Sequence, residues 1–153
     1  MKVVAPLLIG AAFVTGISLV PEPTRRRLNA VVVAGAGAAY LSSGSLGAGE
    51  LAFLAPATYC AYRGLSDYRW TGVAWLLHTA WDVVHHRRGA PILPFVPGSS
   101  FGCAVCDPVI AVWCLAGGRS VFDLLTATPR SASAVGPGRA GRRGRGPGRS
   151  APS

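Results

Sequence analysis

The run W-L-L-H-T-A-W-D-V-V-H-H, residues 75–86, decides how this chain is interpreted. It is apolar and rich in tryptophan, yet it carries His78, Asp82, His85 and His86. An aspartate in the middle of a membrane helix costs roughly 2.5–3.5 kcal/mol on insertion scales, so a helix that keeps one needs a partner or a purpose. We therefore interpret this run as a helix with a polar site and the rest of the chain as its scaffold.

The composition is too apolar and too poor in charge for an ordinary soluble domain. Apolar residues make up 50% of the chain and charged residues 14%, with a mean hydropathy of +0.39, whereas soluble domains are about 25% charged. The length of 153 residues leaves room for one domain. The net charge is +9, but six of the arginines lie in residues 130–153. Because the basic charge belongs mostly to this tail, we expect no specific nucleic-acid-binding surface.

Five apolar runs predict an all-α fold, a polytopic membrane bundle of about five transmembrane helices within residues 1–125. They cover residues 3–20, 28–47, 51–65, 70–86 and 101–117. A run of about 18 apolar residues is long enough to be a candidate for crossing a bilayer. The Gly-, Pro-, Ser- and Arg-rich tail, residues 126–153, is predicted to be a disordered cytoplasmic segment.

The first run is interpreted as a retained helix rather than a cleaved signal peptide. Only Lys2 precedes it, whereas Arg25, Arg26 and Arg27 follow it, and a signal peptide carries its positive charge in front. The fifth run contains Pro108. It either begins near Ser100 and kinks at this proline, which we favour, or continues toward residue 125. A four-span bundle, with the first run removed or the fifth not spanning, is the alternative.

The distribution of basic residues predicts an orientation with the N-terminus outside and the C-terminus in the cytoplasm, in a bacterial plasma membrane. Arg87 and Arg88 are the discordant residues. In this orientation Glu50, the histidine pair and the cysteine pair described below all lie near the outer leaflet.

Two further segments indicate partners. The second run contains Gly35 and Gly37 among alanines, and small residues let helices approach closely, so it is a candidate face for homo-oligomerisation as well as for packing within the bundle. The arginine-rich tail would face anionic lipid headgroups, each basic residue contributing about 1 kcal/mol near the surface.

The ionisable residues of the 75–86 run share one helix face. At about 100° per residue, His78, Asp82 and His85 fall within roughly 60° of one another. His78 and His85 are about 10 Å apart along the axis, so a straight helix cannot bring both to one ion. Asp82 paired with His78, His85 or His86 can reach one.

The segment C-A-V-C-D, residues 103–107, supplies the second half of the predicted site. Cys, His and Asp side chains suit zinc first and other transition metals, such as copper or iron, next. The candidate metal ligands are His78, Asp82, His85, His86, Cys103 and Cys106, and the candidate general bases are Asp107 and Glu50. Alternatively, Cys103 and Cys106 form a disulfide.

Three stretches resemble a known family. P-E-P-T-R-R-R-L-N-A-V-V-V-A-G-A-G-A-A-Y-L (residues 21–41), the 75–86 run with its W-D-x-x-H-H motif, and P-I-L-P-F-V-P-G-S-S-F-G-C-A-V-C-D (residues 91–107) with its C-A-x-C-D motif are similar to a family of small bacterial integral membrane proteins of unknown function. The resemblance covers residues 3–122. It implies a polytopic helical membrane protein and brings no activity with it.

Three classes of function fit these observations. The first is a metal-dependent membrane enzyme acting on a lipid or another apolar substrate. The second is a small transporter or ion-binding protein with His78 and Asp82 as a proton or cation relay, and the third is a non-catalytic structural subunit of a membrane complex. No Gly-rich phosphate loop and no Ser nucleophile elbow occurs in the chain.

Overall fold

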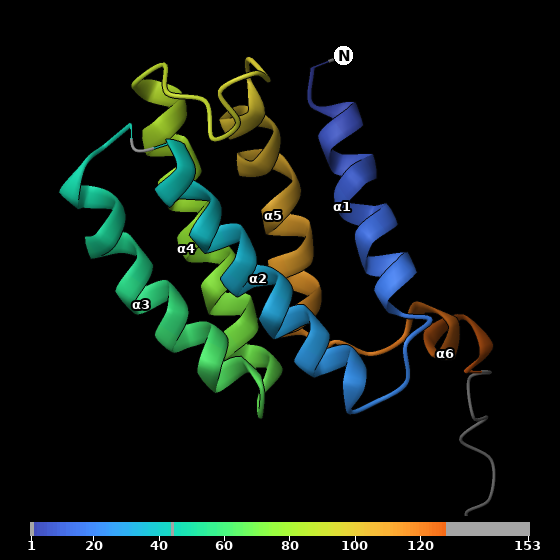
Figure 1. Cartoon of the computed structure of the whole chain (residues 1–153). Coiled ribbons are helices and arrows are strands. Elements are labelled where there is room, and N and C mark those ends of the chain that lie inside the picture. Colours follow the sequence, from blue (N-terminus) through green and yellow to red (C-terminus); the bar gives the residue numbers. More distant parts are fainter. Residues whose placement is uncertain (1, 44, 128–153) are drawn as a thin grey trace, which may run out of the picture.

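The computed structural model describes residues 2–43 and 45–127 as a bundle of α-helices without a β-strand (Figure 1). In chain order the helices are α1 (Val4–Ile17), α2 (Thr24–Ser43), α3 (Ala48–Gly64), α4 (Tyr68–Arg87), α5 (Ser99–Leu115) and α6 (Val121–Thr126). The first five run alternately up and down, and the short α6 lies beside the turn between α1 and α2 (Figure 1). The all-α prediction is therefore confirmed.

Each of the five predicted runs overlaps one of the first five helices, with ends that differ by a few residues. α5 begins at Ser99 and continues through Pro108 to Leu115, as the favoured interpretation of the fifth run expected, and residues 121–126 form a separate helix. In the part of the chain that the structure describes, no single helix combines the length and the apolar character needed to cross a bilayer. Residues 128–153 of the predicted tail lie outside the described residues.

Helix ends follow local side-chain signals. The Asp67 carboxylate accepts a hydrogen bond from the backbone N–H of Arg69 (2.9 Å) and caps the N-terminus of α4. Ser120 caps α6 in the same way through the N–H of Phe122 (3.3 Å). Just past the last turn of α4, Gly89 has a φ of 67°, a left-handed conformation that glycine adopts without steric cost. The chain can therefore leave α4 sharply and enter the proline-rich connection.

α4 is the central helix because it packs against α5, α3 and α2, while α1 covers the other side of α5. Small residues permit these close contacts. A Cβ on Gly72 of α4 would lie 2.7 Å from Leu115 of α5, and a Cβ on Gly10 of α1 would lie 2.8 Å from the carbonyl oxygen of Cys106. Between α4 and α5, Ala74 and Ala111 are fully buried. The buried polar residues of α4 therefore lie against α2, α3 or α5.

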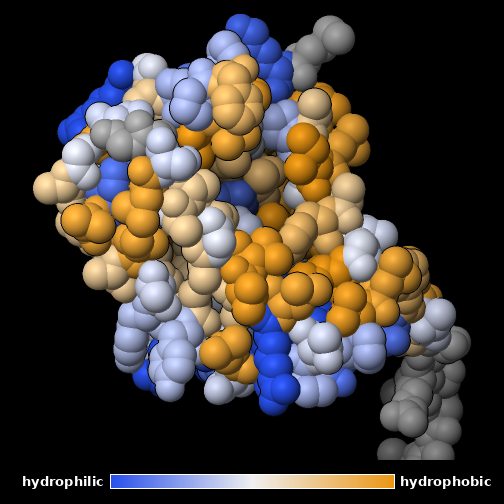
Figure 2. Space-filling view, viewed as in Figure 1, coloured by the Kyte–Doolittle hydropathy of each residue, from blue (hydrophilic) through white to orange (hydrophobic). Residues whose placement is uncertain are grey.

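The outer surface is largely apolar in its middle band. Figure 2 shows hydrophobic residues across the middle of one face and hydrophilic residues concentrated toward both ends of the bundle. Leu8, Val31, Leu51 and Val112, from four different helices, have exposed fractions between 60% and 65%. Several charged or polar residues are in contrast fully buried: Asn29, Glu50, His78, Asp82, His85 and Asp107 are each at most 4% exposed. The bundle thus exposes large apolar side chains on several helices and buries several polar ones.

Candidate functional site

A polar cluster lies where α2, α4 and α5 meet. We call it the interior cluster and define it as Tyr40, Asp82, Cys103, Cys106 and Asp107. The Tyr40 hydroxyl on α2 donates a hydrogen bond of 2.6 Å to Oδ1 of Asp82 on α4. The carboxyl groups of Asp82 and Asp107 are within hydrogen-bond reach of each other. Two carboxyl groups can form a hydrogen bond with each other only if one of them carries a proton, so a bond between α4 and α5 at this point requires one shared proton.

The second oxygen of Asp82 supports this interpretation. Oδ2 of Asp82 is buried and has no hydrogen-bond partner among the described residues. A buried carboxylate without a partner costs free energy. A proton shared with Asp107 removes that cost because it gives Asp82 a donor or an acceptor on the neighbouring helix.

The two cysteines of the C-x-x-C motif extend the cluster along α5. Both thiols are free, and their sulfurs are within hydrogen-bond reach of each other. The Cys106 thiol also donates a hydrogen bond of 3.1 Å to Oδ1 of Asp107. The disulfide alternative is therefore not the state in this structure.

A cavity of about 300 Å³ opens between α1, α2, α4 and α5 beside the interior cluster. Most of its lining is apolar, including Ile9, Phe13, Val32, Ala36, Trp75 and Ile110. Its polar lining consists of Tyr40, His78, Cys103, Cys106 and Asp107. Small-molecule sites typically have volumes of about 300–1,000 Å³ and apolar walls with a few polar groups, and this cavity has both properties.

Glu50 and His85 form a separate buried pair between α3 and α4. The His85 Nε2 lies 3.2 Å from Oε1 of Glu50, and both side chains are at most 2% exposed. Trp81 donates to the other carboxylate oxygen (2.9 Å), and the backbone N–H of Leu46 donates to Oε1 (3.2 Å). The His85 Nδ1 faces the carbonyl oxygen of Ala90 at 3.3 Å. The carboxylate of Glu50, a candidate general base in the sequence, is therefore held by three partners.

The other two histidines lie apart from this pair. His78 is 2% exposed, and its Nε2 has no hydrogen-bond partner among the described residues. That nitrogen faces α2, where a Cβ on Gly37 would lie 3.4 Å away. His86 is exposed on the outside of α4, with its ring 5.3 Å from that of Phe101. The expectation that His86 shares the polar face of His78 and Asp82 is therefore wrong.

The structure thus divides the six predicted metal ligands. Asp82, Cys103 and Cys106 belong to the interior cluster, His85 is bonded to Glu50, His78 lies against α2, and His86 is exposed. In residues 2–43 and 45–127, no three or more His, Cys, Asp or Glu side chains are grouped so that they could hold a metal ion. The reason is that α4 has α3 on one side and α5 on another, so its polar residues point to different neighbours.

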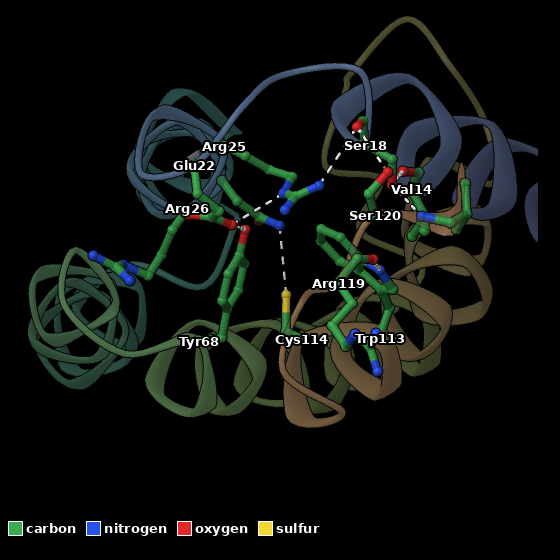
Figure 3. A network of polar contacts seen from close by, with 12 residues as sticks. Val14, Ser18, Glu22, Arg25, Arg26, Tyr68, Trp113, Cys114, Arg119 and Ser120 are labelled. Atoms are coloured by element: carbon green, nitrogen blue, oxygen red, sulfur yellow. Dashed lines mark hydrogen bonds and ion pairs between the residues drawn. The ribbon is translucent and has the colours of Figure 1, made fainter. Parts of the chain in front are cut away.

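At the opposite end of the bundle lies a second polar group, which we call the turn network. Figure 3 shows Ser18, Glu22, Arg25, Tyr68, Cys114 and Ser120 of this network, and its seventh member is Asn29. Arg25 and Tyr68 both donate to Oε1 of Glu22, at 3.0 and 2.7 Å. Arg25 Nη1 and Ser120 Oγ lie 3.4 and 3.2 Å from the carbonyl oxygen of Ser18. The network ties the α1–α2 turn to the starts of α4 and α6.

One helical turn further along α2, Asn29 completes the turn network. It accepts a hydrogen bond from the Trp75 indole (3.0 Å) and faces Cys114 Sγ at 3.4 Å. A cavity of about 440 Å³ adjoins Glu22, Arg25 and Tyr68. It is larger than the interior cavity, but the Glu22 carboxylate on its wall is already bonded to Arg25 and Tyr68.

The electrostatics of the turn network reflect this pairing. Burial opposes the shift, but hydrogen bonds from Tyr68 and Arg25 lower the pKa of Glu22 below its usual 4.5. Burial and the bond to Glu22 raise the pKa of the Tyr68 hydroxyl above its usual 10.0. Burial also opposes the shift at Arg25, whose pKa is raised by its bond to Glu22. The ionised state of Glu22 and Arg25 is thus favoured by the fold.

Residues 1–120 match the family described as "Family of unknown function (DUF6010)". The chain belongs to this family. No curated protein and no solved structure is similar enough to this DUF6010 chain to count as a match. The family of unknown function expected from the sequence motifs is therefore confirmed, over almost the same residues. Membrane location and the role of the two motifs are not part of what this match shows.

Two members of the polar groups were missed by sequence reasoning. Tyr40 closes the interior cluster, and Trp81 bonds to Glu50. Each is an aromatic residue in an apolar helical run, where aromatic residues commonly form the core, so the sequence carries no signal that it belongs to a polar group. Only the meeting of helices distant in sequence gives their polar atoms a function.

Proposed function

We propose that this DUF6010 protein binds a small, mainly apolar molecule in the cavity between α1, α2, α4 and α5 and exchanges protons with it through Asp107 and Asp82. The observation that carries the proposal is the apolar cavity with a carboxyl pair at its wall. Asp107 lines the cavity, and Asp82 lies next to Asp107 on the neighbouring helix.

The chemistry of the lining favours a ligand with one or two polar atoms. An apolar wall binds by excluding water, and a few fixed polar groups orient the ligand. A carboxyl that shares a proton with a second carboxylate can pass it to a carbonyl or hydroxyl oxygen of the ligand, which leaves both carboxylates ionised, and can take it back when the ligand releases it. Neither step needs a group from outside the chain.

The proposal includes a lipid bilayer as the working environment. Large apolar side chains on four helices are more than 60% exposed, while ionisable groups are buried. Contiguous exposed apolar surface is typical of membrane or partner contact. The predicted orientation, with the N-terminus outside and the C-terminus in the cytoplasm, and the contact of the tail with anionic headgroups are parts of the same proposal.

The predicted self-association through α2 is also part of it. Gly37 is already used within the chain because it packs against His78. Gly35 is exposed, and a Cβ there would meet nothing within 4 Å. A homo-oligomeric contact would therefore use the Gly35 side of the helix.

Photolabelling with benzophenone tests ligand binding. Benzophenone is apolar, carries one carbonyl oxygen, and inserts into nearby C–H bonds when it is illuminated. We expect saturable labelling of the purified full chain, with the modified peptides mapped by mass spectrometry to cavity residues such as Ile9 and Ile110.

Two leucine substitutions on α2 form a matched pair for this test. Ala36→Leu fills part of the cavity and should reduce the saturable labelling about tenfold. Ala38→Leu makes the same change at an exposed position and should label like wild type. Equal labelling of both variants, or labelling confined to exposed residues, contradicts the proposal.

Flotation tests the bilayer environment separately. The full chain should float with liposomes of neutral phospholipid and remain with them at high salt, because apolar contact is not screened. Recovery of the chain in the bottom fraction would contradict the membrane part of the proposal and leave the ligand-binding part to be judged by the labelling.

A further inference from the structure

The two thiols of the interior cluster are placed as a reactive pair. Cys103 and Cys106 are three residues apart on α5, a spacing that puts their Cα atoms about 5 Å apart on an α-helix. This separation falls inside the range that a disulfide requires. Both thiols line the interior cavity, and both are free. The pair can close to a disulfide without moving α5.

A route for the released protons begins at the same place. The Cys106 thiol donates to Oδ1 of Asp107 at 3.1 Å. Asp107 is in reach of Asp82, whose other oxygen accepts from Tyr40 at 2.6 Å. Asp82 is fully buried, and its Oδ2 has no partner among the described residues. An acceptor for a thiol proton is thus already in hydrogen-bond contact, with a second carboxyl behind it.

We propose that Cys103 and Cys106 are a redox-active dithiol that reduces a quinone bound in the interior cavity. This inference rests on the proposed function, of which it names the ligand class. Both S–H bonds break and one S–S bond forms, so the cysteines lose two electrons and two protons. The quinone takes both electrons, and its two carbonyl oxygens take the two protons, giving the quinol. Asp107 takes the Cys106 proton first and passes it on.

A quinone fits the site for three reasons. Its ring is apolar, as the cavity wall is, and its carbonyl oxygens can accept hydrogen bonds from protonated groups such as Asp107. It accepts two electrons and two protons, which is what a dithiol releases on closing. Both thiols are partly buried against the cavity, which favours a small apolar oxidant over a folded protein.

The test uses the reduced, full-length protein without oxygen. A ubiquinone analogue with a decyl tail serves as the probe, because its fully substituted ring leaves no free carbon for thiol addition. We expect one quinol per protein, seen as loss of the ultraviolet absorption of the quinone. The protein should lose two hydrogen atoms by mass spectrometry, and peptide mapping should place the disulfide between Cys103 and Cys106.

Variants separate the dithiol from the rest of the chain. Cys103→Ser and Cys106→Ser should each form no quinol, whereas Cys60→Ala, which changes a buried cysteine on α3, should react like wild type. Ala36→Leu should slow the reaction about tenfold by displacing the quinone from the thiols. Equal rates for wild type and Ala36→Leu would place the reaction outside the cavity and overturn the inference.

The two proposals fail in different ways. If benzophenone labels the cavity but the quinone leaves both thiols reduced, the dithiol inference is wrong and the ligand-binding proposal stands. If neither saturable labelling nor quinol formation occurs, both are wrong. Circular dichroism of each serine variant checks that the lost reaction is not lost folding.

Discussion

In the turn network the charged groups are bonded to partners, whereas in the interior cluster and on neighbouring His78 buried polar atoms are left without one. Glu22 receives hydrogen bonds from Arg25 and Tyr68. Midway along α4, Nε2 of His78 has no hydrogen-bond partner among the described residues, and Oδ2 of Asp82 gains one only through a proton shared with Asp107. Both regions are polar groups inside one apolar bundle, so the difference lies in how completely they are satisfied.

This difference separates a structural role from a functional one. A buried polar group that is fully paired holds helices in register, and its removal leaves the partner unsatisfied. A buried group that is not paired lowers stability, so a chain that keeps it gains something other than stability. The comparison predicts that the turn network stabilises the fold and that the interior cluster serves the ligand.

Two histidines on α4 provide the largest test of this comparison. His85→Phe should lower the free energy of unfolding by about 3 kcal/mol, because it removes the imidazole that lies 3.2 Å from the buried Glu50 carboxylate. His78→Phe should change it by less than about 1 kcal/mol, because the loss of the hydrogen bond to the Val33 backbone is offset by removal of the unpaired Nε2 from an aromatic surrounding. Chemical unfolding followed by circular dichroism measures both. Equal losses would break the comparison.

Asn29 provides the next test, inside the turn network. Asn29→Ala should lower the free energy of unfolding by about 2 kcal/mol, because the Trp75 indole N–H is then buried without an acceptor. Arg27→Ala, at an exposed position on the same helix, is the control and should be nearly neutral. A neutral Asn29→Ala would mean that the paired region contributes no more than the unpaired one.

The conservative change Asp82→Asn tests the interior cluster itself. The amide nitrogen can donate to Asp107 and the amide oxygen can still accept from Tyr40, so the free energy of unfolding should rise by about 1 kcal/mol. Quinone reduction should slow, because the second carboxyl of the proton route is gone. A loss of stability of more than about 2 kcal/mol would show that Asp82 is structural.

The smallest expected effect is the pH dependence of the turn network. The folded state lowers the pKa of Glu22 below 4.5, so its charged form stabilises the fold above pH 4.5, and this contribution disappears as the pH falls through the lowered pKa. The effect should stay below about 1 kcal/mol because the side chain is 40% exposed. Unfolding of wild type and Glu22→Gln should differ at neutral pH and converge in acid. A difference that persists in acid would assign the effect to another group.

Part of the site could be predicted from residue spacing. His78, Asp82 and His85 follow one another at helical spacing, and all three are buried, as a shared face requires. Glu50 was expected at the level of His85, and the two are bonded. These inferences hold because rise and rotation per residue are constant along a helix.

The sequence predicted one site for these residues, but the structure divides them between two neighbouring helices. The reason is that one face of α4 is wide enough to contact both α3 and α5. Asp82 and His85 differ by about 60° around α4 and by about 4.5 Å along it. That is enough for Asp82 to meet α5 and for His85 to meet α3. One position further, His86 turns out of the bundle.

The sequence by itself determined that the chain is helical, where the five long helices lie, and which residues are polar within apolar runs. These are properties of local composition and periodicity, which do not depend on distant contacts. Only the tertiary structure decided which polar atoms are paired, that Tyr40 joins Asp82, and that the Cys103–Cys106 pair faces a cavity. The physical reason is that pairing depends on the packing of helices far apart in sequence, and a rotation of one helix by a single residue would change every partner.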